Sequence, residues 1–177
     1  MTYYRSFTHF WVSVITGWAL VGGMLLLLIV GLNIASIIGS IFLAPIPGDF
    51  ELTQVGIAVA VFCFLPYCQL FRHNVTADVF TAKANKKIIM FLRIASSIIA
   101  LLFATLLVWR MGDGMLDQKA YNYTTTILQF PIWVAFVPIL ISLCFLIIAS
   151  LLTIGDDFNL TPISTPLANE QALKDGK

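Results

Sequence analysis

The sequence predicts an all-α integral membrane protein with four transmembrane helices, the first of them unusually long. Of its 177 residues, 59% are hydrophobic and 11% are charged, whereas soluble globular chains are roughly half apolar and about 25% charged. The charged residues also leave four long gaps, at residues 6–48, 52–71, 94–109 and 120–155. Because a helix crosses the hydrocarbon core of a bilayer with about 20 apolar residues, each gap indicates a membrane span.

The first predicted span covers residues 10–43. At 1.5 Å per residue it extends about 50 Å, which exceeds the roughly 30 Å of the hydrocarbon core. The helix is therefore expected to tilt, to bend or to begin in the membrane interface. Pro45 and Pro47 end it, since proline lacks the backbone N–H and restricts the residue before it.

The other three spans are predicted at residues 52–71, 88–109 and 132–154. Pro66 is expected to kink the second span, because it removes one hydrogen bond from the helix. Pro131 is expected to open the fourth span, since proline suits the first turn of a helix. An even number of spans places both chain termini on the same side of the membrane. Residues 1–158 are expected to form one four-helix membrane domain, and residues 159–177 a polar C-terminal tail.

The distribution of Lys and Arg predicts which side of the membrane faces the cytoplasm, because cytoplasmic loops carry more of these residues. One side holds Arg5, Arg72, Lys83, Lys86, Lys87 and Arg93, and the other holds Arg110 and Lys119. Both termini and the loop between the second and third spans are therefore expected in the cytoplasm. Residues 74–85 of that loop are predicted to form either a short helix on the membrane surface or a charged turn.

Several function classes are excluded by what the sequence lacks. A net charge of +1 with no basic patch gives no footprint for nucleic acid. The histidines are His9 and His73, both near a span end, so haem ligation within the spans is not expected. No nucleophile with a base, no paired carboxylates and no phosphate loop can be assembled, and Cys63, Cys68 and Cys144 are interpreted as small buried apolar residues. We therefore expect neither an enzyme nor a bound cofactor or metal.

Small residues recur at helical spacing in three of the predicted spans. They are Gly31, Ala35 and Gly39 in the first, Gly56 and Ala60 in the second, and Ser96, Ala100 and Ala104 in the third. Small residues let helix backbones approach closely in lipid. These faces are predicted either to pack within the four-helix unit or, given the long first helix, to bind another membrane protein. The span interiors offer no ionisable group for an ion path of their own.

Three groups of residues at the span ends resemble the motifs of one transporter family. They are Gly48-Asp49-Phe50-Glu51-Leu52, the segment from Leu65-Pro66-Tyr67 through Arg72 and Asn74 to Asp78, and Thr124-Thr125-Thr126 followed by Pro131-Ile132-Trp133. In their order and positions, over residues 10–155, they resemble the small membrane subunit (DctQ-like) of a tripartite ATP-independent periplasmic (TRAP) transporter. Many members of that family carry His where this chain has Asn74.

The resemblance implies a location in a bacterial inner membrane and a division of labour among three proteins. A soluble periplasmic protein captures an organic acid, a large membrane subunit resembling an elevator-type carrier moves it inward with sodium ions, and the small subunit braces the large one. The residues expected at the large-subunit interface or in structural motifs are Gly31, Ala35, Gly39, Glu51, Arg72, Asn74, Asp78, Pro131 and Trp133. Two alternatives stay open: a four-span subunit of another membrane complex, for example a respiratory one, and a scaffold protein unrelated to transport.

Overall fold

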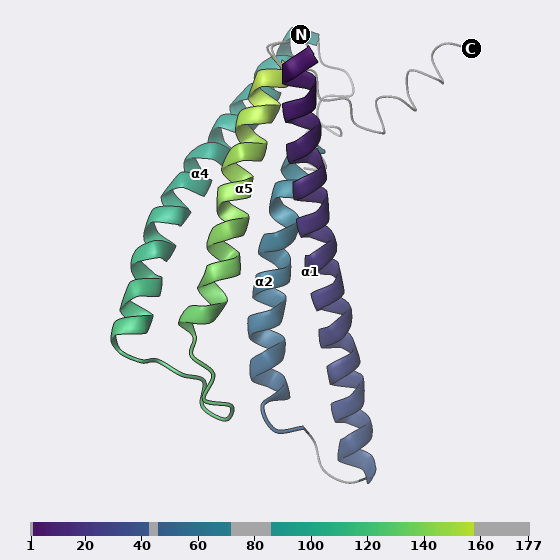
Figure 1. Cartoon of the computed structure of the whole chain (residues 1–177), viewed down its shortest axis with the longest axis vertical. Helices are drawn as coiled ribbons and strands as arrows, with labels where there is room; N and C mark the ends of the chain where they lie inside the picture. The colour runs from purple at the N-terminus through teal and green to yellow at the C-terminus, as the bar shows by residue number, and fades with distance from the viewer. Residues whose placement is uncertain (1, 43–45, 72–85, 158–177) are drawn as a thin grey trace, which may run out of the picture.

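The fold consists of four long α-helices, described in a computed structural model over residues 2–42, 46–71 and 86–157 (Figure 1). The helices are α1 (Thr2–Phe42), α2 (Asp49–Leu70), α4 (Lys86–Ala120) and α5 (Trp133–Asp157). All four are long and apolar enough to cross a membrane. No β-strand occurs in the described ranges. The predicted fold class, an all-α membrane protein with four spans, is confirmed.

The first helix is the longest, as predicted. Its 41 residues extend about 60 Å at 1.5 Å per residue, about twice the thickness of the hydrocarbon core. Figure 1 shows the start of α1 and the end of α5 at the same end of the bundle, as expected for an even number of spans. We call this the terminal end. The opposite end, where a loop joins α4 to α5, is the loop end.

The helices pack in the spatial order α1, α2, α5, α4, which differs from their order in the chain (Figure 1). α5 lies between α2 and α4, so its side chains supply much of the core. The two buried clusters of apolar side chains are Val59, Cys63, Ala104, Ile139, Leu143 and Leu146, and Ile15, Leu70, Ala149 and Leu152. α1 packs mainly on α2, and many of its large apolar side chains are therefore exposed. In a membrane, lipid or another protein covers such a surface.

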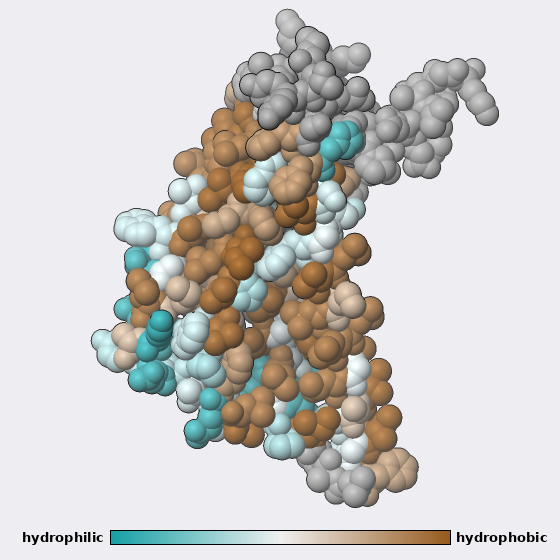
Figure 2. Space-filling view, viewed as in Figure 1, coloured by the Kyte–Doolittle hydropathy of each residue, from teal (hydrophilic) through white to brown (hydrophobic). Residues whose placement is uncertain are grey.

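Several helix boundaries differ from the sequence prediction: α1 already begins at Thr2 and α2 at Asp49, before the predicted starts at residues 10 and 52. α4 continues to Ala120, well beyond the predicted end of the third span at Trp109. Charged residues end a membrane span but do not end a helix, and Gly114 of this extension still packs against Phe136 of α5. Figure 2 shows hydrophilic residues gathered where α4 ends. α5 begins at Trp133, so Pro131 precedes the helix instead of lying in its first turn.

Other predictions concern cysteines and residues that the structure does not describe. Cys63 is buried and Cys68 is partly buried, but Cys144 is exposed on the surface of α5. The prediction that all three are buried is therefore wrong for Cys144, since a cysteine on a lipid-facing helix surface needs no protein neighbour. The proposed surface helix at 74–85 and the C-terminal tail at 159–177 lie outside the described residues.

Candidate functional site

The first turn of α2 and the loop between α4 and α5 meet at the loop end, although they are far apart in the sequence. The carboxylate of Glu51 joins them. Its Oε1 atom accepts a hydrogen bond from the backbone N–H of Ile127 at 2.8 Å, and its Oε2 atom accepts one from Leu128 at 3.1 Å. Two of the motif groups identified in the sequence, the one around Gly48 and the one from Thr124 to Trp133, thus form a single structural junction.

Hydrogen bonds within the loop shape its tip so that it fits Glu51. The backbone N–H of Thr125 donates to the carbonyl of Phe130 at 2.9 Å, and the N–H of Phe130 donates to Oγ1 of Thr125 at 3.0 Å. A bridge pairs Thr124 with Pro131 in antiparallel fashion. These contacts close the loop into a narrow hairpin, whose tip presents the N–H groups of residues 127 and 128.

Gly48 is required at this junction for two reasons. Its φ angle is 79°, in the left-handed region that favours glycine. A Cβ atom at this position would also lie 2.5 Å from Cγ of Leu128 in the loop tip. Gly48 therefore lets the chain turn into α2 and lets the loop tip lie directly against that turn.

The same turn of α2 also holds the last part of α1. The hydroxyl of Ser36 in α1 donates a hydrogen bond to Oδ2 of Asp49. One turn earlier, Nδ2 of Asn33 donates to Oγ1 of Thr53 at 2.8 Å, and Thr53 in turn donates to the carbonyl of Asp49 at 2.7 Å. Asp49 thus binds α1, whereas Glu51 binds the loop before α5.

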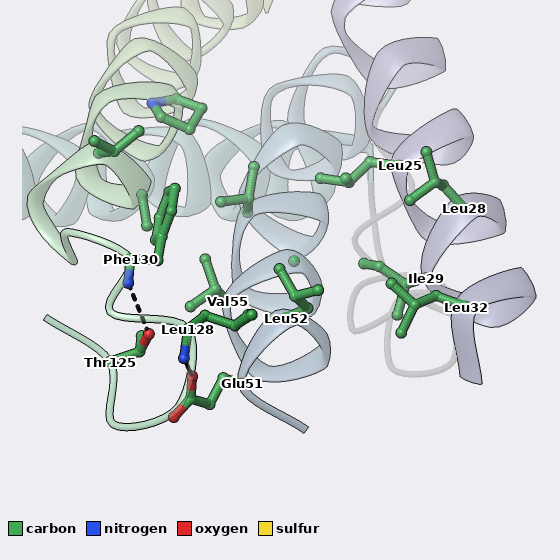
Figure 3. A pocket seen from close by; sticks show the side chains of 15 residues that line it. Leu25, Leu28, Ile29, Leu32, Glu51, Leu52, Val55, Thr125, Leu128 and Phe130 are labelled. Carbon is green, nitrogen blue, oxygen red and sulfur yellow. Dashed lines mark hydrogen bonds between the residues drawn. The ribbon is translucent and has the colours of Figure 1, made fainter. Parts of the chain in front are cut away.

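An apolar groove of about 290 Å³ lies beside the junction (Figure 3). α2 forms its floor, α1 forms one wall, and α5 with the loop forms the other. The groove is lined by Leu25, Leu28, Ile29, Leu32, Glu51, Leu52, Val55, Gly56, Val59, Thr125, Leu128, Phe130, Val134, Ala135 and Pro138. Figure 3 shows the labelled leucines of α1 on one side and Leu128 with Phe130 on the other.

A second polar cluster lies at the terminal end and contains a residue of the middle motif. The side-chain amide of Gln69 in α2 lies 3.4 Å from the hydroxyls of Ser97 in α4 and Thr153 in α5. All three residues are buried. Sequence reasoning did not assign this role to Gln69, although an amide in an otherwise apolar span is itself a signal, since polar side chains in membranes pair across helices.

The small-residue face predicted on α1 points away from the other helices. Gly31 and Ala35 are exposed and Gly39 is partly exposed, and a Cβ atom built on Gly31 would have no neighbour within 4 Å in the described parts of the chain. The close contact with α2 is made instead by Gly22, which the sequence analysis did not select. A Cβ atom there would lie 2.6 Å from Cβ of Cys63.

The small residues of the other helices pack differently. Gly56 and Ala60 of α2 are buried, and a Cβ atom on Gly56 would lie 2.4 Å from Cδ1 of Ile29 in α1. In α4, Ala104 is fully buried but Ser96 is exposed. The face predicted on α2 therefore lies inside the unit, whereas the face predicted on α4 lies only partly inside.

The remaining predicted site residues lie at the junction or outside the described residues. Pro131 takes part in the bridge that closes the loop. Trp133 begins α5, and the Lys119 ammonium lies 5.3 Å from the centre of its ring, within the range of a cation–π contact. Arg72, Asn74 and Asp78 belong to the undescribed range 72–85.

Comparison with known proteins agrees with the placement of these motifs. A family model, the DctQ component of tripartite ATP-independent periplasmic transporters, matches residues 26–159. No curated protein and no solved structure matches the chain. The matched range contains both halves of the junction, the buried Gln69 cluster and the outward face of α1. Since the match covers most of the chain, the protein belongs to the DctQ family, the small permease subunits of TRAP transporters, and is a transporter component rather than an enzyme.

Proposed function

We propose that this small subunit braces a large, sodium-coupled membrane subunit during uptake of an organic acid delivered by a periplasmic binding protein. We further propose that the outward face of α1, defined by Gly31, Ala35 and Gly39, contacts the large subunit. The observation that carries this proposal is the position of that face. It permits close backbone approach, yet Ala35 is exposed and a Cβ atom on Gly31 would meet no atom of the described residues within 4 Å.

The proposal follows from how helices associate in lipid. Lipid tails are as apolar as leucine, so burial from water does not drive helices together in a membrane. Close packing of small residues drives their association instead. A glycine that faces lipid weakens its helix by roughly 1 kcal/mol relative to alanine without any packing benefit. A partner helix lying against Gly31 and Ala35 would supply that benefit.

The division of labour agrees with the distribution of charge. Residues 52–71 and 94–109 contain no Asp, Glu, Lys or Arg, and ion or proton paths through membranes are usually built from such groups. Sodium and substrate sites are therefore assigned to the large subunit. An elevator-type carrier moves one domain against a part that stays fixed, and a long tilted helix widens the anchorage of that fixed part.

Orientation is part of the same proposal. The excess of Lys and Arg at the terminal end supports a cytoplasmic location for both termini in a bacterial inner membrane. The loop end, with its junction at Glu51, then faces the periplasm, on the side from which the binding protein delivers its substrate.

Co-purification of the two membrane subunits tests the α1 interface. Ala35→Leu should separate the backbones, and overpacking of about 1–3 kcal/mol corresponds to roughly 5- to 150-fold weaker association. Because Ala35 is exposed, the small subunit itself should remain folded and abundant. The matched control is Ala58→Leu, the same change at an exposed position of α2, which should leave the pair intact. Full association of the Ala35→Leu subunit, or equal loss with Ala58→Leu, would contradict the proposed interface.

A further inference from the structure

The four helices extend to different distances at the loop end, and α1 reaches farther than α4 and α5 do (Figure 1). Contacts with α5 show which parts of α1 and α4 lie at the same level. A Cβ atom on Gly114 of α4 would lie 3.6 Å from Cε1 of Phe136. Ser142, six residues or about 9 Å farther from the loop end, accepts a hydrogen bond from Nε1 of Trp18 in α1 at 2.8 Å. The level of Gly114 on α1 is therefore about six residues beyond Trp18.

Side chains of opposite polarity lie at this common level. Leu27 of α1 is about level with Leu116 of α4, since each lies a few residues nearer the loop end than the contacts of its helix with α5. α1 carries no Asp, Glu, Lys or Arg anywhere in residues 6–42. On α4, by contrast, four exposed charged side chains surround this level: Arg110, Asp113, Asp117 and Lys119.

The end of α1 beyond this level is both apolar and exposed. From Leu27 to Phe42 the helix continues for about 22 Å at 1.5 Å per residue. Five of its large apolar side chains there are 52–77% exposed: Ile34, Ile37, Ile38, Ile41 and Phe42. Apolar surface of this kind is driven out of water. α1 is one continuous helix without proline, and Figure 1 shows no sharp bend that would return its end to the level of α4.

A bilayer with two parallel surfaces fits both helices only if their inclinations differ. The charge-free part of α4, residues 94–109, is about 24 Å long, slightly less than the roughly 30 Å of the hydrocarbon core, so α4 fits upright. The charge-free part of α1, residues 6–42, is about 55 Å long. It fits the 40–45 Å that include the headgroup regions at an inclination of about 40°, within the range of transmembrane helices. Figure 1 shows α1 and α4 diverging toward the loop end, as the two inclinations require.

We propose that the apolar surface of this chain fits a lipid bilayer in which α4 stands nearly upright and α1 is inclined by about 40°. The loop ends of both helices then lie at one membrane surface, although α1 extends farther along its own axis. Leu27 lies in the hydrocarbon core, whereas Leu116, at the same level of the bundle, lies at the water side of the headgroups. This inference concerns the chain itself and does not depend on the proposed large subunit.

Electron paramagnetic resonance of spin-labelled variants tests this orientation. The label is attached in Leu27→Cys or in Leu116→Cys, at positions that are 71% and 60% exposed. Cys68→Ala and Cys144→Ala remove the other accessible thiols, since Cys63 is buried. The purified full chain is reconstituted in phosphatidylcholine vesicles. Collisions of the label with oxygen, which concentrates in hydrocarbon, are compared with collisions with the water-soluble nickel complex NiEDDA, and their ratio measures the depth of the label.

We expect oxygen collisions to dominate at Leu27 and NiEDDA collisions to dominate at Leu116. Two helices separate α1 from α4, so their axes lie roughly 25 Å apart at about 8–10 Å per neighbouring pair. An inclination of about 40° across that distance places the label at Leu27 about 15 Å deeper than the label at Leu116. A label in Ile41→Cys should give nearly the same ratio as Leu116, because both positions lie at one membrane surface.

Leu102→Cys is the matched control on α4. This position is 65% exposed within the charge-free stretch, so its label should lie in hydrocarbon and show that a label on α4 can report contact with lipid. Equal depths at Leu27 and Leu116 would show that α1 is not inclined relative to α4 in the bilayer and would overturn the proposal. A label at Leu27 that neither reagent reaches would place protein instead of lipid against α1 and would also overturn it.

Discussion

The two sides of α1 differ sharply, although both carry glycine at the surface of one apolar helix. On the inward side, Gly22 lies so close to α2 that a Cβ atom would be 2.6 Å from Cβ of Cys63. On the outward side, a Cβ atom on Gly17 or Gly31 would have no neighbour within 4 Å among residues 2–42, 46–71 and 86–157. The inward side also carries the polar contacts of Asn33 and Ser36 with α2.

The difference teaches that small residues in a span have two separate uses. At Gly22, the missing side chain lets two helices of the same chain pack closely. At Gly31, nothing in the described chain uses the missing side chain, and the proposed interface with the large subunit gives it a use. The spacing of small residues in the sequence reveals helix faces, but the neighbours of each face come only from the three-dimensional arrangement.

The largest expected effect comes from adding one methyl group on the inward side. Gly22→Ala should force α1 and α2 apart, because the clash is with Cβ of Cys63, which cannot rotate away. Overpacking of this kind typically lowers the free energy of unfolding by about 1–3 kcal/mol. Thermal unfolding of the purified small subunit measures the loss.

Gly31→Ala is the matched control for that experiment. The same methyl group on the outward side meets open space, and alanine favours a helix over glycine by up to about 1 kcal/mol. The isolated small subunit should therefore keep or slightly gain stability. Equal destabilisation by the two changes would show that the two sides of α1 do not differ as described.

A smaller effect is expected from the polar contacts on the inward side. Asn33→Ala removes the hydrogen bond to Thr53, and interhelical hydrogen bonds in membranes average about 0.6 kcal/mol. A double-mutant cycle with Thr53→Ala should give a coupling energy near this value. Ser40→Ala is the control, since that hydroxyl donates to the carbonyl of Ile37 within α1. A coupling energy of zero between Asn33 and Thr53 would show that this hydrogen bond does not stabilise the packing of α1 on α2.

Much of the fold could be predicted from the sequence because the charges mark the spans. The four charge-free stretches correspond to the four helices, and the prolines at 45 and 47 correctly marked the end of α1, although that helix begins at Thr2, before Arg5. The end of α4 could not be predicted in this way. Residues 110–120 carry four charged side chains. Charged side chains indicate where a helix leaves the membrane. They do not indicate where the helix itself ends, because its backbone remains helical while one side of it packs on α5.

The site was predictable only as separate motifs. Glu51 and Trp133 were selected because their segments resemble a family, but no local pattern indicates that Glu51 binds the N–H groups of residues 127 and 128, more than 75 residues away. Such pairing depends on the order in which helices pack, and that order, α1, α2, α5, α4, differs from chain order. The outward direction of Gly31 could not be predicted for the same reason.

Site-specific photo-cross-linking from the outward side of α1 tests the central claim most directly. A photoreactive residue at Ile38, which is exposed near Ala35, should give a covalent product of the small and large subunits in native membranes. The same residue at Leu106, exposed on α4, should give no such product. Cross-linking to the large subunit from Leu106 but not from Ile38 would contradict the assignment of the outward face of α1 as the interface.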